Sequence, residues 1–288
     1  KLGIFDVNAA KIVKYIPAND DNLHFAAGLG KLIIIEGGKR LVSRWDLHSF
    51  EREVVAPLEV DGPPHFAVMG SNSEGPFVIG TADGAYDSEA HFFDLANLRK
   101  LELERSGELN NISGDCRASA NGRVFTSWST GTSPSGVQIL VKSRNSLNGY
   151  YEHSSAGYLA PGPKGDRIYS FEGIWTNEAT PVGSADTPRK PTFPAVHGDF
   201  YLSLESDARA RKAEKANLGL YLRGHDRLLL PINGLEPLFQ SIFDRDGESL
   251  PVDKRIHFIP AANLLVTVGL TKDVLNLYPI DIEAALAK

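Results

Sequence analysis

The sequence predicts an all-β chain built from repeats of a small antiparallel sheet. Short apolar runs are rich in β-branched residues and are bounded by glycines, a pattern typical of strands, and no stretch of helical periodicity competes with it. A triplet of aromatic, aspartate and aliphatic residues ends a predicted strand at 5–7, 45–47 and 93–95 and is followed each time by a turn and a further strand. The repeated positions are Phe5, Asp6, Trp45, Asp46, Phe93 and Asp94.

The elements group into repeating units along the chain. The predicted strands are 2–7 and 11–16; 23–27, 31–35, 40–46 and 52–58; 64–69, 76–82, 89–94 and 99–105; 115–119, 123–128, 136–142 and 149–154; 166–171 and 173–176 within a degraded unit at 156–185; 193–196, 199–204, 218–223 and 227–232; and 255–260, 264–269 and 274–282. The charged segment 207–216 is predicted to form one or two helical turns, and 235–254 is a less regular excursion.

The spacing of the units predicts a β-propeller of four-stranded antiparallel blades. The aspartates recur at intervals of 40 and 48 residues, within the usual period of such blades. A four-stranded unit cannot bury both faces alone, so radial stacking of the units explains apolar central strands such as 32–35. Seven positions equivalent to the third strand favour seven blades: Phe5, Trp45, Phe93, Ile139, Trp175, Tyr221 and Tyr278.

In the seven-bladed interpretation, the first two strands and the last strand lie outside, or are frayed at, the ends of this segment. The alternative has six blades, with the strand at 11–16 completing the C-terminal sheet. We expect one propeller domain over 1–288. A first residue of Lys1 rather than Met indicates either that a signal peptide has been removed or, as we expect, that the segment is cut from a longer chain.

Composition excludes some classes of function. Lys and Arg number 30 against 36 Asp and Glu, a net charge of −6, which argues against sequence-independent binding of nucleic acid. No apolar run approaches the roughly 18 residues of a membrane span, so we expect a soluble protein. The single cysteine, Cys116, excludes an intrachain disulfide and is expected to be structural. The compartment stays open.

The triplets at 45–47 and 93–95 resemble the signature of WD-repeat propellers. The segments 5–13 and 193–198 resemble propeller parts of large uncharacterised proteins of planctomycete-type bacteria. This resemblance covers nearly the whole chain at the level of the repeat. It implies a rigid docking surface for a protein partner or for flanking domains of the same chain, an inference from fold alone.

Candidate chemical sites are few. The aspartates Asp6, Asp46 and Asp94 are expected to accept backbone hydrogen bonds in turns, and the aromatic residues beside them are expected to pack between blades. Asp244, Asp246 and Glu248 alternate as in calcium loops, but Leu250-Pro251 interrupts the pattern, so a solvated turn is favoured over a Ca²⁺ site. Eight histidines show no metal-ligand spacing, and His197 is the best isolated candidate.

These observations favour a non-catalytic binding or scaffold propeller that mediates protein–protein interaction and needs no cofactor. The sequence shows no nucleophile elbow and no phosphate-binding loop. Loops at 129–136, 183–192, 206–217 and 235–254 are expected to flank the binding rim. The alternative is a propeller enzyme of lactonase or hydrolase type with a metal in the central channel.

Overall fold

The computed structural model describes ten stretches of the chain. They are residues 1–82, 88–108, 116–129, 136–154, 156–183, 190–205, 215–224, 227–238, 252–270 and 274–287. The strands in them form seven sheets, and the chain divides into two compact units. The first unit contains Lys1–Ser155, Lys164–Asp166 and Asn177–Ala179, and the second contains Ala156–Pro163, Arg167–Thr176 and Thr180–Lys288.

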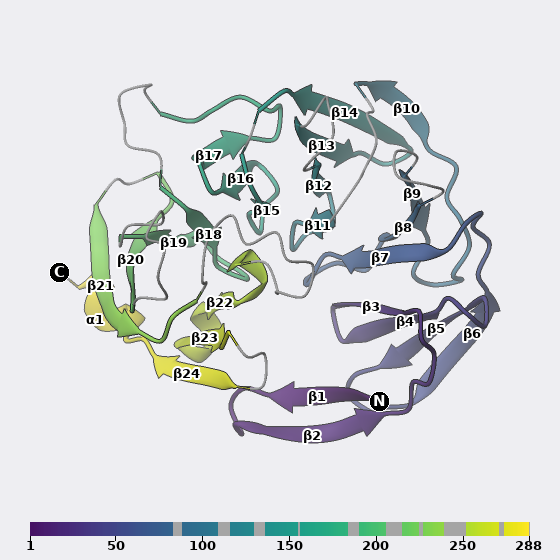
Figure 1. Ribbon diagram of the computed structural model, residues 1–288, viewed down its shortest axis with the longest axis horizontal. Coiled ribbons are helices and arrows are strands. Elements are labelled where there is room, and N and C mark those ends of the chain that lie inside the picture. Colours follow the sequence, from purple (N-terminus) through teal and green to yellow (C-terminus); the bar gives the residue numbers. More distant parts are fainter. Residues whose placement is uncertain are drawn as a thin grey trace. The chain divides into compact units, whose positions relative to one another are not determined.

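The first unit holds four sheets (Figure 1). In chain order its strands are β1 (Leu2–Asp6) and β2 (Lys11–Ile16); β3 (Leu23–Gly28), β4 (Lys31–Glu36), β5 (Leu41–Asp46) and β6 (Arg52–Pro57); β7 (Pro64–Met69), β8 (Phe77–Ala82) and β9 (Ser88–Phe93); and β10 (Glu104–Gly107), β11 (Cys116–Ala118), β12 (Val124–Ser129), β13 (Gly136–Lys142) and β14 (Ser146–Glu152). All neighbouring strands are antiparallel except β10 and β14.

The apolar strand β4 shows how these sheets stack. Its residues 32–35 are at most 3% exposed, so both faces of the strand are covered. Ile33 and Ile35 share a core with Phe77 and Ile79 of the next sheet, whereas Leu32 and Ile34 pack against Ile16 of β2. This confirms that a central strand is packed on both sides by neighbouring sheets, which stacked repeats require.

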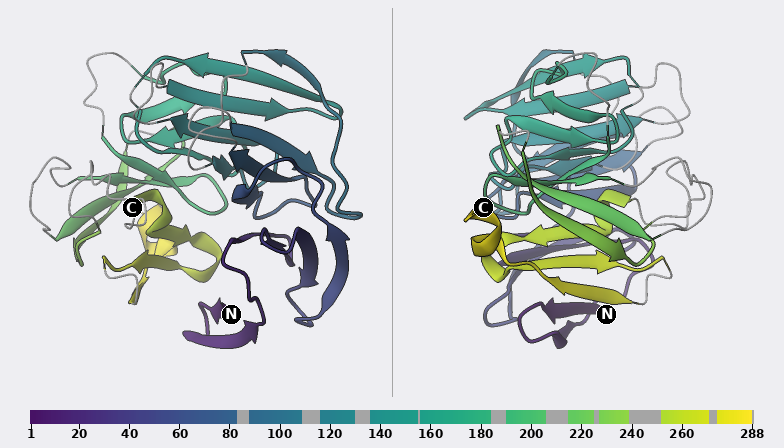
Figure 2. Two further views of the ribbon diagram at one scale, coloured as in Figure 1. Left: turned by 45° about the vertical axis from the view of Figure 1, so that its right-hand side comes forward. Right: turned by 90° about the vertical axis from the view of Figure 1, so that its left-hand side faces the viewer.

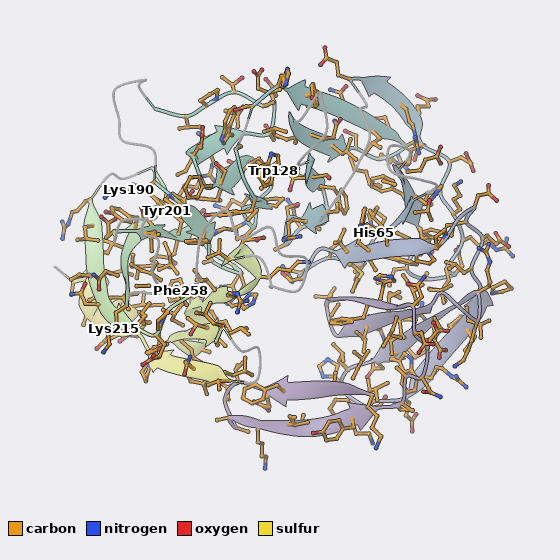
Figure 3. The ribbon with its side chains drawn as sticks, in the orientation of Figure 1. His65, Trp128, Lys190, Tyr201, Lys215 and Phe258 are labelled. Atoms are coloured by element: carbon orange, nitrogen blue, oxygen red, sulfur yellow. The ribbon has the colours of Figure 1, made fainter. Side chains whose placement is uncertain are left out.

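The second unit holds three sheets and the single helix of the described residues. Its strands are β15 (Leu159–Pro161), β16 (Arg167–Ser170) and β17 (Gly173–Thr176); β18 (Thr192–Pro194), β19 (Phe200–Leu204), β20 (Ala216–Leu222) and β21 (Leu228–Leu235); and β22 (Ile256–Ile259), β23 (Leu264–Val268) and β24 (Leu275–Pro279). Short 3₁₀ turns occur at η1 (Val252–Lys254) and η2 (Pro260–Ala262). Phe258, labelled in Figure 3, is fully buried in this unit's core with Leu202, Leu220 and Leu265.

The predicted two strands at the start, three at the end and four in the units at 23–58 and 193–232 are confirmed, but the predicted four-stranded units at 64–105 and 115–154 form sheets of three and five described strands. Sheets of two, three, four and five strands occur among the described residues. The predicted fourth strand at 99–105 pairs with β9 only through the bridge between Phe93 and Lys100. The chain then forms β10, which runs parallel to β14 of the following sheet, beside it in Figure 1. Gly107 permits this pairing, because a Cβ there would lie 2.3 Å from the Gly149 carbonyl oxygen.

The predicted C-terminal strand at 274–282 is too long. The strand β24 ends at Pro279, and Asp281 begins helix α1 (Ile282–Leu286) by accepting a hydrogen bond from the Ala284 amide at 2.9 Å. An aspartate before a short apolar run is a helix N-cap as well as a turn former, which explains the error. Figure 2 shows α1 as the yellow coil beside the C label in its right-hand view.

The seven third-strand positions are distributed one to each sheet. Phe5 lies on β1, Trp45 on β5, Phe93 on β9, Ile139 on β13, Trp175 on β17, Tyr221 on β20 and Tyr278 on β24. The predicted helical segment 207–216 lies outside the described residues except for its last two positions, and Ala216 begins β20.

Candidate functional site: a ledge of linked turns

The repeated aspartates lie in turns of one construction. The Oδ1 atom of Asp6 accepts hydrogen bonds from the Asn8 and Ala9 amides at 2.9 and 3.0 Å. Asp46 and Asp94 do the same with the amides two and three residues further on, at 2.8 to 3.0 Å. In each case the side chain replaces a backbone acceptor and holds the chain reversal closed.

A second feature of these turns was not predicted. The fourth residue after each aspartate has a left-handed backbone: φ is 50° at Ala10, 58° at Phe50 and 60° at Leu98. Glycine or asparagine is expected at such positions. Because alanine, phenylalanine and leucine stand there instead, the left-handed residue could not be predicted from residue type. The recurring aspartate four residues earlier was the available signal.

The aromatic residues before the aspartates differ in burial. Phe93 is 1% exposed and stacks on Phe77, with ring centroids 5.2 Å apart. Trp45 is half-buried against the cluster around Ile16, and its Nε1 donates to Ser43 Oγ at 3.0 Å. Phe5 is also half-buried. The three side chains therefore do not share one depth in the core.

An ionic network surrounds the Asp46 turn and includes Arg44, whose guanidinium reaches the next sheet. The Lys31 ammonium lies 2.8 Å from Asp46 Oδ2 and 2.6 Å from Glu53 Oε1, and Glu53 Oε2 accepts from Arg44 Nε at 2.8 Å. The hydrogen bond from Lys31 holds the pKa of Asp46 well below its usual range. Hydrogen bonds from Lys31 and Arg44 likewise lower the pKa of Glu53. The carboxylates of Asp46 and Glu53 therefore stay ionised at neutral pH, and Glu53 holds the Arg44 guanidinium in place.

Four turns of the first unit are hydrogen-bonded in series. The Leu29 amide donates to the Ser71 carbonyl oxygen at 3.0 Å, and the Asn72 amide donates to that of Ala120 at 2.8 Å. Asn121 Nδ2 then donates to the Lys164 carbonyl oxygen at 2.8 Å. We call these four turns, residues 28–31, 70–73, 119–122 and 164–166, the turn ledge.

Glycine makes the close approach of these turns possible. A Cβ on Gly28 would lie 2.1 Å from the Gly70 carbonyl oxygen, and a Cβ on Gly70 would lie 2.5 Å from the Gly122 nitrogen. Both contacts are with backbone atoms, which cannot rotate away. The ledge therefore presents backbone and the exposed side chains of Leu29, Ser71 and Asn72 on a rigid base.

His197, the histidine singled out in the sequence, lies in the second unit. The Ala261 amide donates to His197 Nε2 at 3.2 Å, so His197 has a structural partner.

The second unit also contains a stack of three tyrosine rings. Tyr201, labelled in Figure 3, lies between Tyr169 and Tyr221, with centroid distances of 5.5 and 5.3 Å. Burial, with a hydrogen bond to Glu205, raises the pKa of Tyr221 to about 12. Glu205 also pairs with Lys190, and the stack thereby ends in an ion pair.

Metal and membrane features are absent from the part of the chain that the structure describes. Asp244, Asp246 and Glu248, the calcium candidates, lie outside the described residues. No cluster of three or more His, Cys, Asp or Glu side chains suited to a metal ion occurs within the described ranges. None of the helical segments described there has the length and apolar character to cross a membrane.

No protein-family model matches the chain, and no curated protein sequence matches it. Solved structures do. The β-propeller domain of Myceliophteria thermophila Cps50 (Swd1) is 13% identical with a TM-score of 0.53, over 97% of this chain and 89% of that one. A chain of the mitotic checkpoint complex is 13% identical with a TM-score of 0.54, over 96% and 80%. Kuenenia stuttgartiensis hydrazine synthase is 10% identical with a TM-score of 0.56, over 96% and 89%.

These likenesses show the fold alone, which is that of β-propellers, and they support the expected WD-repeat-like architecture. The narrower resemblance to proteins of planctomycete-type bacteria gains no support beyond the likeness to hydrazine synthase. At identities of 10 to 13%, no residue of the turn ledge takes a role from these proteins.

Proposed function

We propose that this chain is a non-catalytic propeller that binds a protein partner through the turn ledge. The observation that carries the proposal is the series of hydrogen bonds from Leu29 to Ser71, from Asn72 to Ala120 and from Asn121 to Lys164. A surface that is already ordered loses little conformational entropy when a partner docks. The ledge offers such a surface over four turns of the first unit, with an exposed leucine at one end.

The solved structures support this choice. One of the chains with the same fold belongs to the mitotic checkpoint complex, an assembly of proteins. Propellers expose the turns of several sheets on one face, which suits them to broad contacts with proteins. The enzymatic alternative needs a metal in the central channel, and no cluster suited to a metal ion occurs within the described ranges.

The proposed domain is a single propeller of seven sheets over 1–288. The one-per-sheet placement of the seven third-strand positions supports this number. In the proposal β1 and β2 are the third and fourth strands of their sheet, and two further strands pair with the open edge of β1. Phe25 on β3 is 55% exposed, as expected where a neighbouring inner strand is missing. A crystal structure of a longer chain with nothing paired to that edge would exclude this arrangement.

The binding proposal is tested with two matched variants. Leu29 on the ledge is 48% exposed and Val55 on the outer strand β6 is 46% exposed, so a change to glutamate is equally accommodated at both. Proteins captured by the immobilised chain would be identified by mass spectrometry and their affinity measured by interferometry. We expect Leu29→Glu to weaken binding at least about tenfold, because it puts a charge in place of an apolar contact, and Val55→Glu to leave it unchanged.

Two results would contradict the proposal. One is the absence of any protein that binds the wild-type chain reproducibly. The other is an equal loss of binding in both variants, because a general effect of negative charge would then explain it. Circular dichroism of each variant shows whether its sheets are intact.

A further inference from the structure

Two cations lie directly opposite each other at the ledge end of the sheet β11–β14. The Lys142 amide donates to the Arg123 carbonyl oxygen at 2.7 Å, immediately beyond the paired residues Val124 and Val141. Directly opposite residues of an antiparallel pair point to the same face, and like charges there are destabilising. Arg144 follows two residues later in the turn to β14 and is exposed. We call Arg123, Lys142 and Arg144 the cationic site.

The equivalent position in the second unit carries opposite charges. There the Arg223 amide donates to the Asp199 carbonyl oxygen at 2.7 Å, the same backbone relationship as in the cationic site. The two side chains form an ion pair, with Arg223 Nη1 3.6 Å from Asp199 Oδ1. The repeat therefore accommodates a cation and an anion at this position, and Arg123 stands where the anion would be.

The cationic site has no carboxylate partner among the residues that the structure describes. Within the described ranges, none of its three side chains forms an ion pair with an aspartate or glutamate. Lys142 Nζ instead donates to the carbonyl oxygens of Ser143 and Arg144, at 3.0 and 3.4 Å. Burial lowers the pKa of Lys142, and the charge of Arg123 lowers it further. An incoming anion would relieve this repulsion.

We propose that the cationic site binds an acidic segment of the protein partner, a run of peptide carrying several carboxylates. The inference rests on the proposed function and adds the partner's chemistry to it. Two guanidinium groups suit carboxylates, which they bind bidentately. The site also adjoins the turn ledge, because Arg123 directly follows the turn 119–122. A nucleic acid is disfavoured, since the chain carries a net charge of −6 and the site is only one turn wide.

The direct test uses a fluorescein-labelled peptide of eight glutamates and fluorescence anisotropy at low salt. We expect saturable binding to the wild-type chain and at least about tenfold weaker binding to the triple variant Arg123→Gln, Lys142→Gln, Arg144→Gln. The control variant Lys11→Gln, Lys14→Gln, Arg52→Gln removes the same charge elsewhere and should change the affinity by less than about twofold. An equal loss in both variants, or no binding to the wild type, would overturn the site.

A second variant separates binding from folding. Arg123→Asp should form with Lys142 the ion pair that Asp199 forms with Arg223, so we expect an unchanged or higher Tm, by about 1–2 °C, together with lost peptide binding. A lower Tm or retained peptide binding would contradict the inference. So would a single-stranded oligonucleotide that displaces the peptide at lower concentration than free octaglutamate does. Failure of these tests leaves the Leu29→Glu comparison intact, so the two proposals fail separately.

Discussion

Arg44 on β5 donates from Nη1 to the carbonyl oxygens of Leu95 and Ala96, at 2.6 and 2.7 Å. Leu95 and Ala96 belong to the aspartate turn of the following sheet, so one side chain ties two repeats together. Glu53 holds the other edge of the guanidinium at 2.8 Å. The contact joins the ionic network of one sheet to the turn motif of the next.

Arg44→Met should uncouple these two sheets. The variant loses three hydrogen bonds from a charged donor, two to the next sheet and one to Glu53, and we expect a fall of about 1–3 kcal/mol in the free energy of unfolding, measured by urea denaturation. Arg52→Met is the control, because Arg52 is exposed, lies 5.8 Å from the centroid of the Trp45 ring, and forms no side-chain hydrogen bond or ion pair with the described residues. The control should cost less than about 1 kcal/mol. Equal losses would mean that Arg44 does not couple the sheets.

Asp94→Ala removes the acceptor for the Ala96 and Asn97 amides in the third aspartate turn. We expect a loss of about 1 kcal/mol in the free energy of unfolding, typical of a lost capping side chain. Asp94→Asn keeps an oxygen at the same place and should lose less than half as much. If both variants were as stable as the wild type, the hydrogen bonds of this turn would contribute nothing to stability.

Gly70→Ala tests the close packing of the turn ledge. The added Cβ would lie 2.5 Å from the Gly122 nitrogen and from the Ser119 carbonyl oxygen, so the turns must separate. We expect a loss of about 1–3 kcal/mol, the usual range for overpacking. Gly3→Ala is the control, because its Cβ would meet Tyr15 at an ordinary 3.5 Å. A ledge indifferent to Gly70→Ala would not be closely packed.

His91 should make stability depend on pH. Its side chain is 3% exposed, Nε2 lies 3.0 Å from Thr81 Oγ1, and Nδ1 has no hydrogen-bond partner in the described ranges. Burial lowers the pKa of His91, and the charges of Lys100 and Arg105 lower it further, against the opposing charges of Glu89 and Asp61.

A lowered folded-state pKa contributes stability above the unfolded value of about 6.5, and this contribution is lost as the pH falls through the folded value. We therefore expect the Tm of the wild type to fall more steeply below pH 6.5 than that of His91→Asn. Equal slopes in the two proteins would show that His91 does not titrate on unfolding. A titration of the imidazole by NMR would give the folded-state pKa directly.

The sequence predicted the strands most reliably where their patterns were local. The apolar run 32–35 and the aspartate triplets each contain their own signal, since burial on both faces and Asx turns depend on adjacent residues. The strand β10 escaped prediction because its partner, β14, lies about forty residues away, and its pairing depends on the space beside Gly107. The predicted last strand ran through Asp281 to residue 282, whereas Asp281 is the N-cap of a short helix.

The candidate site was harder to predict than the fold. Most of its hydrogen bonds join backbone atoms of successive turns. Every residue type has these atoms, so only the glycines that permit close approach give a signal in the sequence. The like-charge pair of Arg123 and Lys142 became visible only when β12 and β13 were in register. Residues 19 apart in the sequence have no reason to be compared until the strand pairing is known.

Hydrogen exchange at the ledge tests the central claim most directly. The Leu29 and Asn72 amides donate to the turn of the next sheet, whereas no described residue accepts a hydrogen bond from the exposed Ser71 amide. If the turns form one rigid binding surface, residue-resolved NMR should show the Leu29 and Asn72 amides exchanging at least about 100-fold more slowly than the Ser71 amide. Equal, rapid exchange at all three would contradict the account, because the turns would then be independent loops.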